Sequence, residues 1–524
     1  MVEIQEKGRE RGRGRKAAQN PAPGQEKKTS QSLGQHRKTK DAGPRGRDKR
    51  LEREDSGGRR RKPQSVESTE IHGSRKNLGT GRTWNEKPGR EPGHTVSEEE
   101  RESRKGRQRN RASARERREG QAAKLPGAAR PSQNAEAGKG KRKVQSLCSV
   151  SGRCGGCQLL DVPYDKQLAA KEKQVTELLK GFCRVYPITG MEDPFHYRNK
   201  VHAAFGYRKG EAVSGIYKEG THEIVPIDSC MLEDKEADQI ITTVRGMLKS
   251  FKLRTYDEDT GYGFLRHVLV KRGFATGQIM VVLVTASPVF PSKNHFVKAL
   301  LEKHPQITTI IQNLNDRHTS MVLGDREHVL YGKGYIEDEL CRRVFRISSK
   351  SFYQVNPVQT EKLYKKAMEA AALTGKETVI DAYCGIGTIG IVAAEKAGRV
   401  IGVEMNQDAV RDAVQNARRN KITNIQFYNN DAGQFMAGMA DAGERADVVF
   451  MDPPRSGSTE EFIEAVSVLR PRRVVYVSCN PETLARDLKV FKKNGYKAER
   501  AWPFDMFPHT EHVEVACCLQ RKDL

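Results

Sequence analysis

The spacing of hydrophobic positions changes twice along this chain. In "YDKQLAAKEKQVTELLK" they recur at helical spacing, which predicts a helix over 164–180 that ends at Gly181. Short alternating runs separated by turn residues follow to about residue 345, with one helical stretch over 235–251. The alternation predicts an antiparallel β-rich region.

After Ser351, apolar strands alternate with helical stretches. Strand-like runs such as "ETVIDAY", "RVIGVEM", "ADVVFMD" and "RRVVYVS" stand among helices predicted at 357–372, 388–397, 407–420, 460–469 and 481–494. This order predicts a doubly wound α/β domain with a mainly parallel sheet. Ligands of such sheets bind beyond the carboxyl ends of the strands, so the loops that follow the strands are candidate site positions.

The first 143 residues lack apolar periodicity and are rich in Gly, Arg, Lys, Ser and Glu. They contain 40 Lys and Arg against 20 Asp and Glu and account for +20 of the chain's net charge of +25. We predict a disordered basic arm over 1–143, followed by domains over 144–345 and 346–524. The arm suits nucleic-acid phosphates, and a solvated tail explains its composition equally well.

The chain also shows no signal for secretion or membrane insertion. No apolar stretch approaches the roughly 18 residues that cross a bilayer, and no early apolar segment follows the N-terminal charges. We therefore expect a soluble cytoplasmic protein without a membrane partner. Ten cysteines in such a chain favour thiol chemistry or metal ligation over a disulfide framework.

Three cysteines gather just after the arm in "CSVSGRCGGC". Cys148, Cys154 and Cys157, with Cys230 further on, make four thiolates that suit a zinc ion or an iron–sulfur cluster. The two glycines inside the C-x2-C pair leave backbone amides free to approach sulfide, which favours the cluster. The cysteines without partners at ligand spacing are expected to be buried free thiols: Cys183, Cys341, Cys384, Cys517 and Cys518.

A glycine-rich loop marks a nucleotide-like cofactor site. "DAYCGIGTIG" contains G-x-G-x-x-G between a strand and a helix, and Glu404 ends the next strand, which suits both NAD(P) and S-adenosylmethionine. Asp381 at the end of the first strand suits a ligand with an amine or a cation. Asp452 opens a "DPPR" loop that two prolines make rigid. We favour S-adenosylmethionine, with Tyr383 either packing or contacting its adenosine.

The stretch "VYVSCNPETLARDL" places Cys479 at a corner between a strand and a helix, on the ligand-binding edge of the sheet. A thiolate beside a methyl donor suits addition to C6 of a pyrimidine, which makes C5 nucleophilic. Glu514 in "HVEVACCL" is placed to remove the C5 proton. His509 and His512 are alternative bases or RNA contacts, although packing or surface roles explain them as well.

These motifs together resemble a known family. "SFYQVNP", "DAYCGIGTIG", "DPPRSG", "SCNPETLARDL" and "HVEVACCL", in this order and spacing, are similar to those of the RNA 5-methyluridine methyltransferases. The resemblance implies a class I, Rossmann-like methyltransferase domain with Cys479 as nucleophile and Glu514 as proton acceptor. It further implies contacts to the methyl donor from Gln354, Tyr383, Glu404, Asp431 and Asp452.

The cysteine pattern resembles the branch of this family that carries a [4Fe-4S] cluster and modifies 23S ribosomal RNA. The transfer-RNA branch of some bacteria lacks these cysteines, and many members begin with an OB-like domain where this chain has the basic arm. The expected partner is therefore ribosomal RNA, with transfer RNA as the alternative. The resemblance implies no protein partner, and we expect a monomer. Basic residues expected to help hold RNA, unless they only solvate strand faces, are Arg198, Lys200, Arg208, Arg266, Lys271 and Arg272.

Three other functions fit parts of the sequence. A cytosine-5 methyltransferase uses the same attack on C6, but "DPPRSG" lacks the second cysteine usual in the RNA enzymes of that type. A non-catalytic RNA-binding or assembly protein would keep the fold without needing Cys479. An NAD(P) oxidoreductase would use only the glycine loop.

Overall fold

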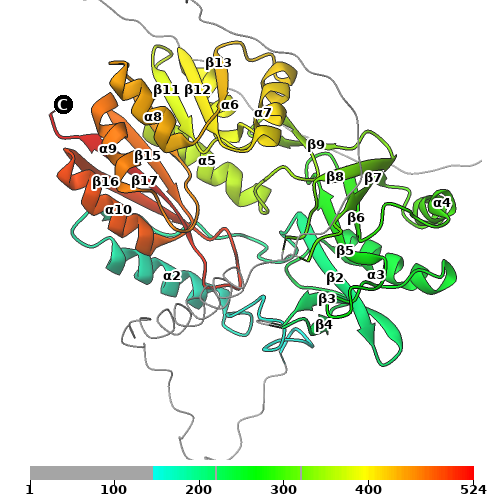
Figure 1. The fold of residues 1–524 in the computed structure, drawn as a ribbon. Coiled ribbons are helices and arrows are strands. Elements are labelled where there is room, and N and C mark those ends of the chain that lie inside the picture. The colour runs from blue at the N-terminus through cyan, green and yellow to red at the C-terminus, as the bar shows by residue number, and fades with distance from the viewer. Residues whose placement is uncertain (1–145, 219–220, 319–320, 524) are drawn as a thin grey trace, which may run out of the picture. The chain divides into compact units, whose positions relative to one another are not determined.

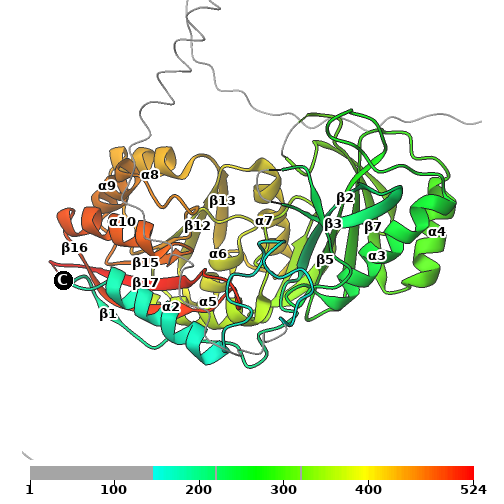
Figure 2. The same ribbon diagram turned by 90° about the horizontal axis from the view of Figure 1, so that it is seen from below.

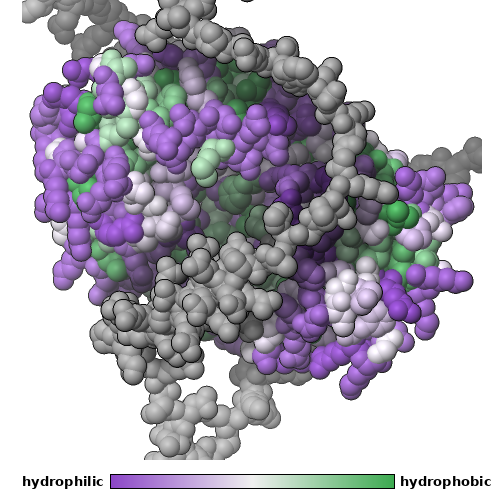
Figure 3. All heavy atoms as spheres, in the orientation of Figure 1, coloured by the Kyte–Doolittle hydropathy of each residue, from purple (hydrophilic) through white to green (hydrophobic). Residues whose placement is uncertain are grey.

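A computed structural model describes residues 146–218, 221–318 and 321–523. The basic arm expected over 1–143 lies outside these residues. Two large sheets organise the described part of the chain, and each is flanked by helices (Figure 1). No helix in this part is long and apolar enough to cross a membrane. On the face seen in Figure 3, polar side chains cover most of the described surface.

The central sheet has seven strands in the order β4-β3-β2-β5-β6-β7-β8. They are β2 (Lys200–Arg208), β3 (Glu211–Tyr217), β4 (Ile224–Pro226), β5 (Leu265–Arg272), β6 (Ile279–Thr285), β7 (Ile307–Leu314) and β8 (Arg326–Tyr331), with helices α3 (Lys235–Ser250) and α4 (Lys293–Lys303). The predicted antiparallel β-rich region is found at every pair of this sheet except one, because β6 and β7 run parallel. A parallel pair needs a crossover, which the unpredicted helix α4 provides.

The second sheet has eight strands in the order β1-β16-β17-β15-β14-β11-β12-β13. They are β1 (Arg184–Val185), β11 (Thr378–Ala382), β12 (Arg399–Glu404), β13 (Ile425–Asn429), β14 (Val448–Met451), β15 (Arg473–Ser478), β16 (Tyr496–Phe504) and β17 (Glu514–Arg521). Only the β15–β17 and β16–β17 pairs are antiparallel. The predicted doubly wound, mainly parallel α/β sheet is confirmed.

Helices cover both faces of this sheet, and a small hairpin precedes them. The helices are α5 (Pro357–Ala371), α6 (Thr388–Ala393), α7 (Gln407–Arg419), α8 (Ala432–Asp441), α9 (Glu460–Leu469) and α10 (Pro481–Lys493), with a 3-10 turn at Ala394–Lys396; the hairpin pairs β9 (Ile336–Leu340) with β10 (Arg343–Ile347). α5 and α10 each begin with an Asn cap followed by Pro, whose fixed φ suits the first helical position. α8 was not predicted.

The N-terminal part of the described chain joins the C-terminal sheet. Helix α2 (Tyr164–Leu178) packs beside α10, and β1 extends the sheet by pairing in parallel with β16. Both elements lie next to the orange and red C-terminal elements in Figures 1 and 2. Segments from opposite ends of the described chain therefore pack against each other.

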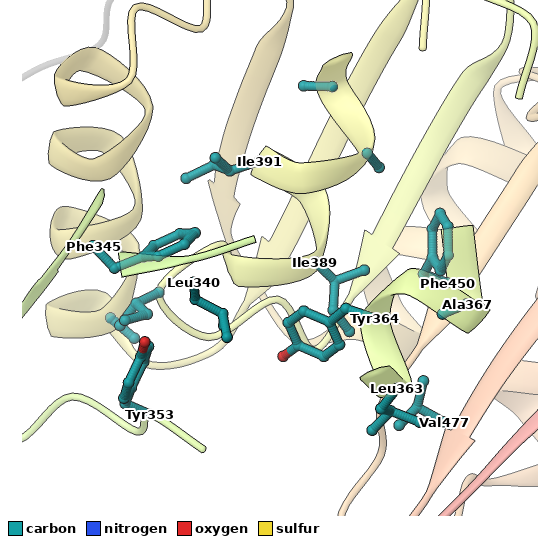
Figure 4. Close-up of a cluster of buried hydrophobic side chains, with 14 of the residues drawn as sticks. Leu340, Phe345, Tyr353, Leu363, Tyr364, Ala367, Ile389, Ile391, Phe450 and Val477 are labelled. Atoms are coloured by element: carbon teal, nitrogen blue, oxygen red, sulfur yellow. The ribbon is translucent and has the colours of Figure 1, made fainter. Parts of the chain in front are cut away.

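One buried cluster connects the two sheets. It combines Met280 and Val282 of the central sheet with side chains of the hairpin, of α5 and of the C-terminal sheet. Figure 4 shows part of it, with Leu340, Phe345, Leu363, Tyr364, Phe450 and Val477 among the labelled residues. Because such clusters are close-packed, the central sheet gives the C-terminal sheet rigid support.

Candidate active site

Cys479 lies at the carboxyl end of β15, as the sequence predicts. The corner is fixed locally: the backbone N–H of Asn480 donates to Ser478 Oγ over 3.2 Å, and the side chain of Asn480 accepts the N–H of Glu482 over 3.0 Å. Pro481 then starts α10. These contacts stop β15 after Ser478 and leave the Cys479 thiol half-buried at the sheet edge.

Glu514 faces this corner from the neighbouring strand. β15 and β17 are antiparallel, and Ser478 pairs with Val515, so Cys479 and Glu514 come next to each other in the register. The Glu514 side chain is buried. Burial and the nearby Asp452 raise the pKa of Glu514 to about 8. Burial, Glu514 and Asp452 raise the pKa of Cys479 to about 11.

Arg455 is a side chain to which sequence reasoning gave no role, although its "DPPRSG" motif was recognised. Its positive charge lowers the pKa values of both Cys479 and Glu514 against the effect of burial. Its Nη2 lies 2.7 Å from Nδ1 of the exposed His512. A cation at this point favours the thiolate and the carboxylate, the forms that a nucleophile and a base need.

Asp381 is buried in β11 at the glycine loop. Its Oδ2 accepts the N–H of Gly390 over 2.7 Å, and its Oδ1 has no hydrogen-bond partner among the described residues. A Cβ atom on Gly390 would lie 2.9 Å from Oδ2, so this glycine permits the contact. Burial and the carboxylates of Asp452 and Glu404 raise the pKa of Asp381 to about 8.

Glu404 ties the glycine loop to the end of β12. Its carboxylate accepts N–H groups from Gly385 over 3.1 Å and from Asn406 over 2.7 Å. Tyr383 follows β11 with a left-handed φ of 64° and packs its ring 5.4 Å from that of Phe462. The loop is thus held at the same edge as Cys479.

The remaining residues predicted to contact the methyl donor are Asp452, Asp431 and Gln354. Asp452 is half-buried after β14, and burial raises its pKa to about 7. Asp431 is exposed after β13 and caps α8 by accepting the N–H of Gln434 over 3.0 Å. Gln354 is half-buried, and its backbone carbonyl accepts an N–H from the Asn199 side chain over 3.0 Å.

The carboxyl groups of Asp381, Glu404 and Asp452 form an acidic cradle. Its charge selects between NAD(P) and S-adenosylmethionine, the two candidate cofactors. Asp381, Glu404 and Asp452 lie close enough for the last two to raise the pKa of the first. An acidic cradle with one unpaired buried oxygen suits the sulfonium and ammonium groups of S-adenosylmethionine, because their positive charges favour the ionised carboxylates. It opposes the diphosphate of NAD(P), which prefers a helix N-terminus without carboxylates.

The cysteine segment has part of the predicted arrangement. Burial and the thiols of Cys154 and Cys148 raise the pKa of Cys157 to about 11, and burial and Glu233 raise that of Cys230 to about 12. Backbone amides lie 3.4 Å from the sulfur atoms of Cys154 and Cys230, as donors to cluster sulfur do. Still, no group of three or more His, Cys, Asp or Glu in the described residues is arranged to hold a metal ion.

The five remaining cysteines are unpaired. Cys384, Cys517 and Cys518 are buried, as predicted, whereas Cys183 and Cys341 are only partly buried. The Cys183 thiol hydrogen-bonds that of Cys517, and this contact lowers its pKa.

His509 packs away from the candidate nucleophile. Its ring is buried and stacks on Phe195 with a centroid distance of 4.7 Å, and its Nδ1 lies 3.1 Å from the Gln167 side-chain nitrogen. The packing interpretation of this histidine therefore fits its position, and a role as base or RNA contact does not.

Three of the six basic residues expected to face RNA are engaged inside the protein. Arg266 pairs with Glu258 over 2.8 Å, Lys271 donates to the carbonyls of Ser348 and Ser351, and Arg272 pairs with Asp234 over 2.7 Å. Arg266 and Lys271 are buried, which does not fit the prediction that they hold RNA, because alternation along a strand does not reveal which charges meet partners from other elements. Arg272 is 28% exposed beside its partner. Arg198, Lys200 and Arg208 keep solvent-exposed surface.

Known proteins resemble this chain over the whole described region. Residues 163–522 match the model of the family "tRNA (Uracil-5-)-methyltransferase". An uncharacterized RNA methyltransferase of Halalkalibacterium halodurans is 43% identical over 386 residues, which cover 73% of this chain and 84% of that protein. A further one from Clostridium acetobutylicum is 41% identical over 392 residues, covering 74% and 85%.

A solved structure agrees in fold as well as in sequence. The tRNA (uracil-54, C5)-methyltransferase of Pyrococcus abyssi in complex with S-adenosyl-L-homocysteine superposes with a TM-score of 0.59 at 28% identity, covering 70% of this chain and 86% of that one. The match to the family model, over residues 163–522, includes both the acid-lined cradle and the Cys479 corner. The chain belongs to the tRNA (uracil-5-)-methyltransferase family and is an RNA methyltransferase.

Proposed function

We propose that this protein methylates C5 of a specific uridine in 23S ribosomal RNA, with Cys479 as nucleophile and Glu514 as proton acceptor. The observation that carries the proposal is the juxtaposition of a half-buried thiol and a buried carboxyl across the β15–β17 pair, beside an acid-lined cradle. Family membership supports uracil C5 as the target. The target base leaves its stack to reach the thiol, as bases in single-stranded RNA do most easily.

Cys479, the methyl donor and Glu514 act in this order in the proposed reaction. The Cys479 thiolate adds to C6, and the electron pair displaced from the C5–C6 double bond makes C5 nucleophilic. S-adenosylmethionine supplies the methyl group, which C5 accepts. Glu514 then takes the proton from C5, the double bond re-forms and the bond between sulfur and C6 breaks. The Cys479 thiolate is thereby restored, and Glu514 returns to its starting state when it releases the proton.

The cradle residues divide the binding of the donor among them. Asp381 offers its unpaired Oδ1 to the ammonium group, and Glu404 is placed for the ribose hydroxyls. Tyr383, Asp431 and Asp452 complete the site at the same sheet edge, and Gln354 joins it from the segment between β10 and α5. Together with burial and Glu514, Asp452 also raises the pKa of Cys479. Changes to the other residues should raise the KM for the donor more than they alter attack by the thiol.

Ribosomal RNA is proposed over transfer RNA because the four cysteines match the ribosomal branch. The alternative is favoured by the family's description and by the Pyrococcus abyssi structure, both of which refer to transfer RNA. Mapping 5-methyluridine in total RNA from cells with and without the gene decides between them. A site lost from 23S RNA supports the proposal, and a site lost only from transfer RNA replaces it.

The same mapping separates the other classes of function. Methyl groups on cytosine would replace the uridine proposal with a cytosine-5 methyltransferase. No change in any methylated base, with a growth or assembly defect that a Cys479→Ala gene repairs, would support a non-catalytic role.

The cysteines Cys148, Cys154, Cys157 and Cys230 are proposed to hold a [4Fe-4S] cluster. Protein purified without oxygen is expected to contain about four iron atoms per chain and to absorb visible light. Cys154→Ser should lose both signals, whereas Cys341→Ser, which changes a distant thiol, should keep them. Zinc in place of iron would overturn this assignment.

The activity is expected to rise with pH through the neutral range. The pKa of Glu514 is raised to about 8 and that of Cys479 to about 11, so at pH 7 both groups hold protons that the reaction must remove. Raising the pH from about 6 to about 8.5 forms more carboxylate and more thiolate, and kcat/KM should increase throughout this range. A flat or falling profile at saturating donor contradicts the two assigned roles.

A further inference from the structure

The loop between β16 and β17 places Glu514. β16 ends at Phe504 and β17 begins at Glu514, so the position of the carboxyl depends on how the loop over 505–513 is held. The backbone of this loop is anchored from three separate elements. Tyr197 donates to the carbonyl of Pro508 over 3.1 Å, and Asn356 donates to that of Met506 over 3.0 Å.

Helix α2 supplies the charged anchor. Lys171 Nζ lies 2.6 Å from Asp505 Oδ1 and 3.2 Å from the carbonyl oxygen of Phe507. The side chains of Lys171 and Asp505 are 2% and 0% exposed. A buried pair of this kind gains little stability over well-packed apolar side chains, because both charges lose their hydration. Its benefit lies in fixing where the two groups meet.

Gln167, one turn earlier on α2, anchors the middle of the loop. Its Oε1 accepts the backbone N–H of His509 over 3.0 Å, and its Nε2 lies 3.1 Å from His509 Nδ1. The same Nε2 donates to the carbonyls of Leu159 and Val162. His509 has a left-handed φ of 65°, which a non-glycine residue keeps only when its surroundings hold it there.

We propose that Lys171 and Gln167 are positioning residues for proton removal from C5. They hold residues 505–509 of the loop that leads into Glu514, so they help to set the distance between its carboxyl and the target carbon. The inference rests on the proposed function, in which Glu514 is the base. It adds that α2, which follows the cysteine segment and contributes none of the proposed catalytic side chains, controls one step of the reaction and not the others.

The test separates that step from the covalent attack. RNA containing 5-fluorouridine traps the enzyme after attack and methyl transfer. Fluorine at C5 replaces the hydrogen that the base removes as a proton, and a base cannot remove fluorine in this way. The trapping rate thus reports attack and methyl transfer, which do not require Glu514, and turnover on ordinary RNA also requires Glu514. The double variant Lys171→Met/Asp505→Leu removes the pair without leaving a buried charge. Gln167→Leu is the second variant, and Val175→Ala is the control.

Val175 is a fitting control because it is fully buried on the same helix but belongs to an apolar cluster and not to the loop contacts. For both test variants we expect trapping within about twofold of the unchanged protein, and turnover reduced roughly 10- to 100-fold because the base is misplaced. Melting temperatures identify any loss of folded protein, which lowers trapping and turnover equally, as expected for Val175→Ala.

Two results would overturn the inference. One is an equal loss of trapping and turnover in the test variants, matching their loss of folded protein. The other is turnover that stays unchanged. If the unchanged protein itself forms no adduct with 5-fluorouridine RNA, the proposed function fails first, and that failure is visible before any variant is made.

Discussion

Replacing Cys479 with alanine is expected to abolish methyl transfer, with a loss of at least about 10³-fold in kcat, because the proposed reaction begins with addition of its thiolate to C6. The change removes one sulfur atom from a half-buried corner whose contacts come from Ser478 and Asn480, so the fold should persist. Binding of S-adenosylmethionine, followed by calorimetry, should stay within about threefold, since the cradle lies on other strands.

Cys518→Ala is the matched control. Cys518 is a buried thiol on β17 that pairs in register with Val475 and donates to the carbonyl of Ala370, so it does not reach the proposed site. Its replacement should leave the rate nearly unchanged. An active Cys479→Ala protein, or an adduct with 5-fluorouridine RNA at another residue, would rule out the proposed nucleophile.

Glu514→Gln is expected to stop the reaction after methyl transfer, at the removal of the proton from C5. The amide keeps the shape of the side chain but cannot take the proton from C5, so turnover should fall by about 10²- to 10⁴-fold. The enzyme should then accumulate as a covalent complex with ordinary methylated RNA, visible as a slow band on a denaturing gel. The pH dependence that Glu514 causes near pH 8 should also disappear.

The neighbouring Glu511→Gln provides the comparison for this variant. Glu511 is exposed on the loop before Glu514 and has the same type of side chain, so it tests whether any acid near the site has this effect. Glu511→Gln should turn over normally and leave no adduct. If Glu514→Gln turns over at the normal rate, another group removes the proton, and His512 beside Arg455 becomes the next candidate.

Local chemistry explains which parts of the fold the sequence predicts well. The start of α10 follows from Asn480 and Pro481, because the proline ring fixes its own φ. The glycine loop follows from glycines such as Gly385 and Gly387, which can adopt the positive φ values that the turn needs. The short helices α4 and α8 were missed, since about ten residues give a weak periodic signal. The parallel β6–β7 pair was missed for the same reason, because its crossover is α4.

The candidate site divides in the same way. Residues that end successive parallel strands were found because topology alone brings them to one edge. The role of Arg455 and the internal engagement of Lys271 depend on which side chains meet across strands and loops. Lys171 and Asp505 are 334 residues apart, and nothing near either one indicates its partner.

The pairing of β1 with β16 has a consequence for synthesis of the protein on the ribosome. β1 and α2 emerge early, but their partners β16, β17 and α10 are translated last. Until then the apolar side of α2, including Val175, has no surface to cover it. The nascent chain therefore exposes the apolar positions of the α2 segment through most of its elongation. Chaperones that shield such segments would be most useful during this period.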